Sequence, residues 1–296
     1  MKHFVVVFLL AFTFSSCEKT IKITVQDQSP KLVVEASIEN GQPAFVALSS
    51  SLNFFSSITQ QELSNSFVHN AKIILSEGSK INTLKEYAIT DTSGYTYYYY
   101  TVDSSNLPNA IIGGFNKQYQ LTIQTEDGQL YTAQTTIPLI TKTVDSIWWE
   151  KSENNPDTNR CLMYGKFTDP PGFGNYIRYF TKTNGNVFLP GLNSVFDDQV
   201  VDGKTYSVSF DMGYNKRTNE PSGEDYGFAR RGDTVTLKFC NIDKATFNFW
   251  NTWEFSYQSY GNPFSSPIKV IGNISNGALG SFSGYAAMYK TIIIPK

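Results

Sequence analysis

The apolar and polar positions of residues 29–139 alternate with a period of two in several short runs, which predicts β-strands. The clearest case is 31–51, where Asn40-Gly41 joins two alternating runs and favours the tight turn of a β-hairpin. A polar stretch at 56–66 is interpreted as a loop. The other strand signals lie at 71–76, 95–101 and 118–136. About seven short strands with turns at regular spacing predict an immunoglobulin-like β-sandwich for 29–139.

The same alternation continues through residues 140–296 and predicts a second β-rich domain there. Its strand signals lie at 144–150, 160–168, 175–183, 204–212 and 233–240. The pattern changes at 243–260, where aromatic residues recur at helical spacing and Asn241 or Asp243 could cap a helix start. The same aromatics also fit a period of two, so a strand is the alternative, but the length of the segment favours a helix. The predicted fold class is all-β with one short aromatic helix that covers a sheet.

The C-terminal stretch 262–285 is predicted to form a rigid lid of loops and strand packed beside the aromatic segment. Pro263 and Pro267 each lack a backbone donor, which argues against a central strand and favours a loop or an edge. Glycines alternate there with large apolar residues, a pattern typical of a backbone that turns often while it buries side chains. A final strand is predicted at 289–294.

The N-terminus has the pattern of a bacterial lipoprotein signal. An apolar run at 4–14 is too short to span a bilayer, which needs about 20 apolar residues. Ser15 and Ser16 precede Cys17, as in the lipobox whose cysteine is acylated and becomes the new N-terminus. We therefore expect a signal peptide at 1–16, lipidation of Cys17, and a tether at 17–28; an ordinary cleaved signal is the alternative. Two or more acyl chains anchor a protein stably in a bilayer.

Composition and charge exclude several classes of function. The formal net charge is −2 and no run of Lys and Arg occurs, so we expect no nucleic-acid partner. The only histidines are His3, in the signal peptide, and His69, which is interpreted as a solvated loop residue. A histidine zinc site or a Ser-His-Asp triad needs more than this. No nucleotide, hydrolase or calcium motif is present. We expect no enzyme activity, no metal and no cofactor.

Two further groups of residues leave alternatives open. Cys161 and Cys240 could form a disulfide in an oxidising compartment, or they could be buried free thiols. The acidic pairs Asp197-Asp198 and Glu224-Asp225 could suggest a glycosidase, which needs two carboxylates across a sugar. The simpler interpretation is that they are solvated loop acids.

Five residues are candidates for ligand contacts. Trp148 and Trp149 are adjacent in a predicted strand, so they point to opposite faces; one should be core, and the other could stack on a sugar or a partner. Asn262, Phe264 and Asn273 lie in the predicted C-terminal loops.

Taken in order, several fragments resemble one known family. They are the lipobox, the opening LVVEASIENGQPAFVALSSS, Asp169-Pro170 ahead of Asn175-Tyr176, and the ending NPF..P.....NI.NG.LG.FSGY. The chain resembles a Bacteroidetes lipoprotein family catalogued as domain of unknown function 4249, over nearly all of the mature length. The resemblance implies a lipid-anchored location in the outer membrane and a TonB-dependent receptor as partner. The family carries no known catalytic or binding residues to transfer.

We therefore expect a non-enzymatic outer-membrane lipoprotein that captures a ligand for, or docks on, a TonB-dependent transporter. It would be bound to the lipid bilayer through acylated Cys17 and face the periplasm or the cell surface. A structural or adhesive envelope lipoprotein is the alternative, followed by a surface glycan hydrolase. The ligand is not identified by any motif.

Overall fold

The computed structural model describes residues 29–52, 59–91, 94–152, 156–215, 226–262, 264–266 and 268–296. These residues form mainly β-strands, with a short helix α2 (Gln60–Asn65), one turn of 3-10 helix (Leu107–Asn109) and a longer helix α3 (Lys244–Ser259). The predicted all-β class with one short aromatic helix is confirmed. The strands are β1 (Leu32–Glu39), β2 (Phe45–Ser50), β3 (Lys72–Glu77), β4 (Lys80–Thr90), β5 (Thr96–Val102), β6 (Lys117–Gln124), β7 (Leu130–Ile137), β8 (Thr143–Lys151), β9 (Arg160–Thr168), β10 (Tyr176–Thr183), β11 (Leu189–Phe196), β12 (Thr205–Phe210), β13 (Ala229–Arg230), β14 (Thr234–Ile242) and β15 (Leu279–Ile293).

The first half contains β1 to β7. In the sheet these strands are neighbours in the order β1-β2-β5-β4-β3-β6-β7. The hairpin predicted at Asn40-Gly41 is confirmed: β1 and β2 pair antiparallel, and Gly41 has the positive φ of 77° that this turn requires. Alternate residues of β1 point into the core, so that Val34, Ala36 and Ile38 are buried. Although β1 and β7 are far apart in the sheet order, they contribute to the same core, so the sheet is strongly curved.

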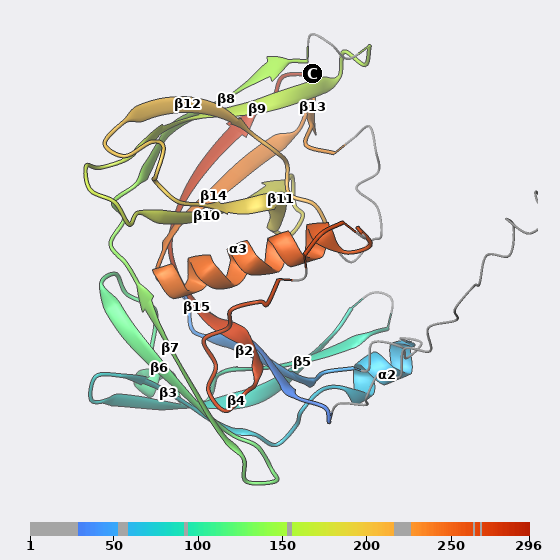
Figure 1. Cartoon of the computed structure of the whole chain (residues 1–296), viewed down its shortest axis with the longest axis vertical. Coiled ribbons are helices and arrows are strands. Elements are labelled where there is room, and N and C mark those ends of the chain that lie inside the picture. Colours follow the sequence, from blue (N-terminus) through green and yellow to red (C-terminus); the bar gives the residue numbers. More distant parts are fainter. Residues whose placement is uncertain are drawn as a thin grey trace, which may run out of the picture.

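The longest strand, β15, joins the two halves of the molecule. Its first residues pair in parallel with β1, and its last residues pair antiparallel with β14. One sheet of eleven strands therefore runs through the described part of the chain, in the order β11-β10-β14-β15-β1-β2-β5-β4-β3-β6-β7 (Figure 1). The domain boundary predicted between residues 139 and 140 falls in the connection from β7 to β8. Independent folding of the two halves stays a prediction.

The prediction that 262–285 contains no central strand was wrong for its last part. Residues 279–285 begin β15, which lies in the interior of the large sheet. The strand begins well after Pro263 and Pro267, so the prolines do not interrupt its ladder. Gly280 lets β15 pack closely against β1, because a Cβ at this position would lie 1.9 Å from the Val34 carbonyl oxygen. Its φ of 99° is also one that other residues rarely adopt. The strand predicted at 289–294 is the last part of β15.

The second half is a sandwich with a helix on its outer side. A small sheet of β12, β9 and β13, with β8 also paired to β9, packs on one face of β10, β14 and β15. Helix α3 packs on the opposite face of the same strands, and Figure 1 shows it crossing that face between the two halves. Alternation along β10 divides its side chains between these layers: Ile177 and Tyr179 face the small sheet, whereas Tyr176 and Phe180 face α3.

The segment 243–260 is a helix, as its length predicted, and the strand alternative was wrong. Asp243 is the N-cap, and its Oδ1 accepts a hydrogen bond from the backbone of Thr246 at 2.8 Å. Its other carboxylate oxygen, Oδ2, accepts one from the backbone N–H of Thr136 at 2.9 Å, which ties α3 to the first half. Phe249 is buried, whereas Tyr260 at the C-terminal end is 77% exposed, so only part of the aromatic series is core.

The loop predicted at 56–66 was wrong for the described residues 59–66, which contain α2. The reason is a capping box: Thr59 accepts from the Glu62 backbone, and the Glu62 carboxylate accepts from the Thr59 backbone at 2.8 Å. This reciprocal pair satisfies two donors at the helix start and stabilises even a short helix.

Candidate functional site

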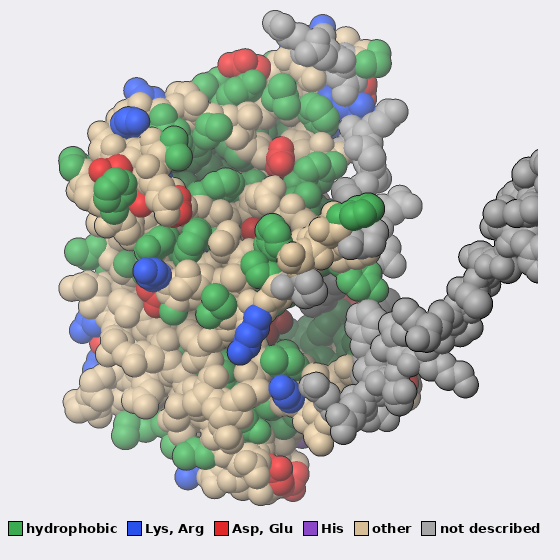
Figure 2. All heavy atoms as spheres, viewed as in Figure 1, with side chains coloured by type: hydrophobic (Ala, Val, Ile, Leu, Met, Phe, Trp, Pro, Cys, Tyr) green, Lys and Arg blue, Asp and Glu red, His purple; other side chains and the backbone are tan. Residues whose placement is uncertain are grey.

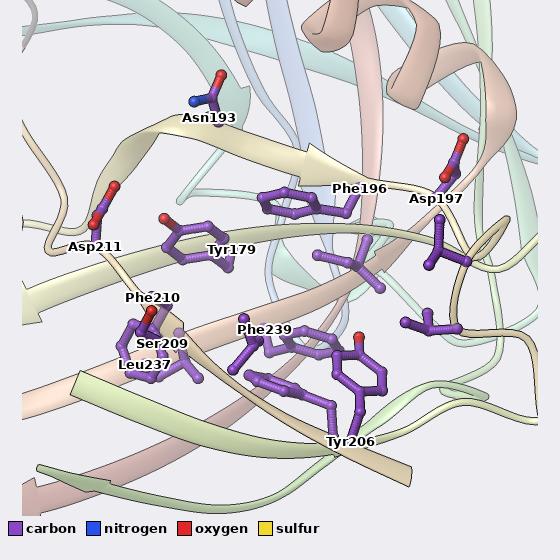
Figure 3. A pocket seen from close by; sticks show the side chains of 15 residues that line it. Tyr179, Asn193, Phe196, Asp197, Tyr206, Ser209, Phe210, Asp211, Leu237 and Phe239 are labelled. Carbon is purple, nitrogen blue, oxygen red and sulfur yellow. The ribbon is translucent and has the colours of Figure 1, made fainter. Parts of the chain in front are cut away.

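An apolar hollow with a volume of about 570 Å³ lies between the two sheets of the second half (Figure 3). We call it the inter-sheet pocket. One wall is the inner face of β10, β14 and β11, and the other is β12 together with Phe167 of β9. The lining residues are Phe167, Ile177, Tyr179, Asn193, Phe196, Asp197, Val200, Val201, Tyr206, Val208, Ser209, Phe210, Asp211, Leu237 and Phe239.

The pocket is open because two edge strands meet at its mouth. In the described part of the chain β11 pairs only with β10, and β12 only with β9. Just beyond β12 the backbone N–H of Tyr214 donates to the Pro190 carbonyl of β11 at 3.1 Å, but the two strands themselves stay unpaired. Val208 lies on the inner face of β12, between the inward-facing Tyr206 and Phe210, yet it is 48% exposed. Phe196 faces inward from β11 and is also 48% exposed. Residues with inward orientation and high exposure mark an unfilled part of the sandwich. Figure 2 shows apolar side chains at the surface of this half.

Six aromatic residues line the pocket, and several of their rings pack on one another. The Phe167 ring stacks on Phe239 with centroids 5.2 Å apart, and Tyr206 lies 5.7 Å from Phe167. Between the neighbouring strands β10 and β11, Tyr179 stacks on Phe196 at 6.2 Å. Such pairs contribute about 0.5–1.5 kcal/mol beyond the area they bury. The walls are therefore formed before any ligand arrives.

The position of Tyr179 depends on a glycine in the neighbouring strand. A Cβ added to Gly191 of β11 would lie 2.2 Å from the Tyr179 hydroxyl oxygen, so any larger residue would displace the ring. Burial raises the pKa of the Tyr179 hydroxyl, and the negative charge of Asp211 raises it further. Tyr179 is therefore a neutral phenol at physiological pH, and it presents an aromatic face and one hydroxyl to this end of the pocket.

The polar groups of the pocket lie at its rim. Figure 3 shows Asp211 and Asp197 at opposite ends of the group of rings, with Asn193 between them. Asp211 accepts a hydrogen bond from Tyr226 at 3.2 Å, and burial raises the pKa of Tyr226 to about 12, so that Tyr226 remains a donor. The lining residues contain two carboxylates and neither Lys nor Arg.

None of the five predicted ligand residues lines the inter-sheet pocket. Trp148 stacks on Tyr164 with ring centroids 5.7 Å apart. Trp149 packs against the core between the two sheets of the second half, and the Arg231 guanidinium carbon lies 4.9 Å from its ring centroid. Both tryptophans are thus engaged on β8, on the far side of the small sheet from β12.

The three loop candidates also lie elsewhere. Asn273 exchanges two hydrogen bonds of 2.8 Å with the backbone of Phe282, which is a structural clamp on β15. Asn262 accepts from the backbone of Phe264 at 3.0 Å, and the Phe264 side chain is 95% exposed. In these contacts the side chains of Asn262 and Asn273 hold backbone groups in place, and the contacts do not indicate a ligand at either residue.

The structure bears on the prediction for two of the three cysteines. Cys161 and Cys240 are buried free thiols, which is one of the two alternatives left open. Cys17 and the expected signal peptide lie outside the described residues, so lipidation stays a prediction.

The interpretation of Asp197-Asp198 as solvated acids was wrong for Asp198, which is 2% exposed. Burial alone would raise the pKa of Asp198, but hydrogen bonds from Asn175, including one of 2.8 Å from its backbone, outweigh burial and lower it. Oxygens of Asp169, Asp198 and Asp202 lie within 4.8 Å of one another. The buried ammonium of Lys142, 3.1 Å from Asp169, supplies a positive charge there. Glu224 and Asp225 lie outside the described residues.

His69 was interpreted as a solvated loop residue, and this was wrong in part. Its side chain is 41% exposed, but its Nδ1 lies 2.5 Å from a carboxylate oxygen of Glu86. Its ring also meets the edge of Tyr98 at 4.4 Å. The imidazole therefore connects the loop before β3 to β4 and β5, and it is not among the residues that line the inter-sheet pocket.

The fold defines an all-β protein whose second half carries an open apolar pocket. The chain belongs to the family described as domain of unknown function DUF4249, whose profile matches residues 18–291. Among curated proteins none matches the sequence. One solved structure, trypsin-activated alpha-2-macroglobulin from Escherichia coli, is similar at 10% identity and a TM-score of 0.22. That match covers 74% of this chain and only 15% of the other.

No helix among the described residues has the length and apolar character needed to cross a membrane.

Proposed function

We propose that this chain is a non-enzymatic outer-membrane lipoprotein that captures a small ligand in the inter-sheet pocket and presents it to a TonB-dependent transporter. The observation that carries the proposal is the pocket itself. It has a volume of about 570 Å³ and walls of aromatic and aliphatic side chains, and ligand pockets commonly have about 300–1,000 Å³ and such a lining. Its mouth opens between two edge strands, so a ligand can enter without displacing a strand.

The absence of an enzyme activity is part of the proposal. The polar groups that line the pocket are two aspartates, one asparagine, one serine and two tyrosines, and neither His nor Cys is among them. A glycan hydrolase would need two carboxylates facing one sugar. Asp198, one candidate for that work, is buried and bound to Asn175, which does not favour such a role.

The anchor and the partner rest on the sequence. Cys17 in its lipobox supports lipid attachment, and family resemblance supports a TonB-dependent transporter as partner. Residues 17–28 give the anchored domain about a dozen residues of tether. Substituting Cys17→Ala is expected to leave the protein in the periplasm or as unprocessed precursor, which fractionation and intact mass would show. The same protein in the outer membrane with its processed mass unchanged would contradict the anchor.

Ligand capture is tested by closing the mouth of the pocket. Purified full chain carrying Cys17→Ala would be titrated with dansylamide, a neutral aromatic probe whose fluorescence rises in apolar surroundings. We expect Val208→Trp to weaken binding at least tenfold, because residue 208 faces the open part of the pocket. Ser207→Trp is the matched control, since Ser207 lies on the same strand outside the lining and should bind like the parent.

Equal loss of dansylamide binding in both variants, or no binding by the parent, would overturn ligand capture. Recovery of other envelope proteins with the tagged lipoprotein, together with no probe binding, would favour a structural or adhesive role. Recovery of a plug-domain receptor would support the transporter partner.

A further inference from the structure

We propose that the ligand of the inter-sheet pocket is a cation: an aromatic or apolar body that carries an ammonium group, held at the Asp211 end. The inference rests on the proposed function, because it concerns the same pocket. It starts from the charges of the lining, which are two carboxylates, Asp197 and Asp211, with no basic side chain to balance them.

Among the described residues, the basic side chains nearest to the pocket already have other partners. Lys142 lies behind the Tyr206 ring, is 1% exposed, and is paired with Asp169 at 3.1 Å. Lys204 extends from the loop after β11 and donates to the Val200 carbonyl at 3.1 Å.

Arg178 is next to Tyr179 in the sequence, but alternation along β10 places it on the α3 face. There it donates to Ser194 and Tyr285 and stacks over Trp250. These contacts hold its guanidinium away from the inter-sheet pocket. At the Asp211 end an anionic ligand would therefore meet a carboxylate with no basic side chain in the described lining, whereas a cationic ligand would supply the missing charge.

The Asp211 end also has the aromatic surroundings that an ammonium group favours. Tyr179 and Phe210 lie next to Asp211 in the lining, with ring centroids 6.2 Å apart. Tyr226 donates to one Asp211 oxygen at 3.2 Å and fixes the carboxylate. Rings attract a cation placed over their faces, by about 0.5–2 kcal/mol depending on solvation. Asp211 is exposed at the rim of the pocket, and a carboxylate held there beside such rings favours an ammonium group.

Asp197 lies at the opposite end of the same lining, and we assign it a weaker, longer-range contribution. It is partly exposed beside Phe196 and Val200, and its Oδ1 accepts only a long contact of 3.4 Å from the Gln199 backbone among the hydrogen bonds of the described residues. No side-chain donor among the described residues holds this carboxylate as Tyr226 holds that of Asp211, so it is oriented less firmly toward a bound charge.

The test is a series of probes with one fluorophore and three charges: dansylcadaverine, which is cationic, dansylamide, which is neutral, and dansylglycine, which is anionic. With the full chain carrying Cys17→Ala, we expect dansylcadaverine to bind at least tenfold tighter than dansylglycine, with dansylamide between them. The ratio of cationic to neutral affinity should fall about fivefold in Asp211→Asn and less in Asp197→Asn. It should be lost in the double variant, and it should shrink in 0.5 M NaCl because salt screens the charges.

Glu35→Gln is the matched control, because it removes one exposed carboxylate from β1, outside the pocket lining, and should keep the parental ratio. Equal affinities for the three probes in the parent would overturn the inference while leaving ligand capture intact, and so would a ratio that survives in the double variant. A ratio that falls equally in Glu35→Gln would also overturn it, since net charge would then explain the preference. Failure of dansylamide itself to bind would overturn both proposals.

Discussion

The two halves of the molecule share one large sheet, but the sheet is covered differently in each half. In the first half the curved sheet closes over its own core, where Val46, Ile73 and Phe282 are all 0% exposed. In the second half the two sheets meet fully along β9 and β14 but separate between β11 and β12, and Phe196 is left 48% exposed. The difference shows that one continuous sheet can be a closed core at one end and the wall of a pocket at the other.

The closure of the first half depends on β15, so the largest effect is expected there. Gly280→Ala would place a Cβ 1.9 Å from the Val34 carbonyl oxygen, at a φ of 99° that alanine adopts poorly. We expect a loss of at least about 4 kcal/mol in the free energy of unfolding, or failure to fold.

Urea denaturation followed by tryptophan fluorescence measures this loss. Gly185→Ala is the control, because no atom lies within 4 Å of the added Cβ and its φ is not positive. A Gly280→Ala protein as stable as Gly185→Ala would mean that β1 and β15 do not pack as described.

A matched pair of substitutions compares the closed core directly with the open pocket. Phe282→Ala should cost about 3–5 kcal/mol, because it leaves a cavity in a filled core. Phe196→Ala should cost about 1 kcal/mol, because its ring is half in solvent and borders a pocket that is already unfilled. Both are read from urea denaturation midpoints, and equal costs would contradict the distinction between the two halves.

Parts of the first half were predictable because their signals are local, although the 11-residue strand β4 was not predicted. Its hairpins carry their own turn signals, such as Asn40-Gly41 and Asp127-Gly128, and neighbours in sequence are mostly neighbours in the sheet. The capping box of Thr59 and Glu62 is visible in the sequence, but the polar composition around it led to the prediction of a loop in place of helix α2.

The pocket could not be predicted, because it depends on a strand with an unfavourable sequence. β11 contains Pro190 and Gly191, which argue against a strand, yet Pro is tolerated at an edge and Gly191 makes room for Tyr179. β10, β12 and β14 were predicted as strands, but no local pattern says which edges meet. For β15 the prolines and glycines of 262–285 argued against a central strand. The prolines precede the strand, however, and its glycines permit close packing.

A buried ion pair closes one end of the second half, and breaking it should have an intermediate effect. Lys142 and Asp169 have side chains that are 1% and 0% exposed and lie 3.1 Å apart. Asp169→Asn removes the direct partner of the buried ammonium and leaves it with the neighbouring carboxylates of Asp198 and Asp202, which should cost up to about 3 kcal/mol of unfolding free energy. The double variant Lys142→Met/Asp169→Leu should be more stable than Asp169→Asn. Urea denaturation distinguishes them, and a harmless Asp169→Asn would show that the ammonium finds water.

The smallest effect concerns the thiols and depends on pH. Burial raises the pKa of the Cys240 thiol to about 12, and it also raises that of Cys161. An unfolded thiol titrates near 8.5. Between these values the unfolded chain releases a proton that the folded chain keeps, so the stability contributed by Cys240 is complete below pH 8 and declines as pH rises. The slope approaches about 1.4 kcal/mol per pH unit.

In a Cys17→Ala background, the difference in unfolding free energy between the parent and Cys240→Ala should therefore shrink from pH 8 to pH 10. Ellman's reagent should leave both native thiols unmodified at pH 8, because the thiolate is the reactive species and both sulfurs are buried. It should label both in denaturant. Two outcomes would contradict this: rapid labelling of the native protein, or no labelling after denaturation without reductant, which would reveal a Cys161–Cys240 disulfide. The closed packing around Cys240 is what keeps its proton, so this titration measures closure on the helix-covered face of the sheet whose other face forms the pocket.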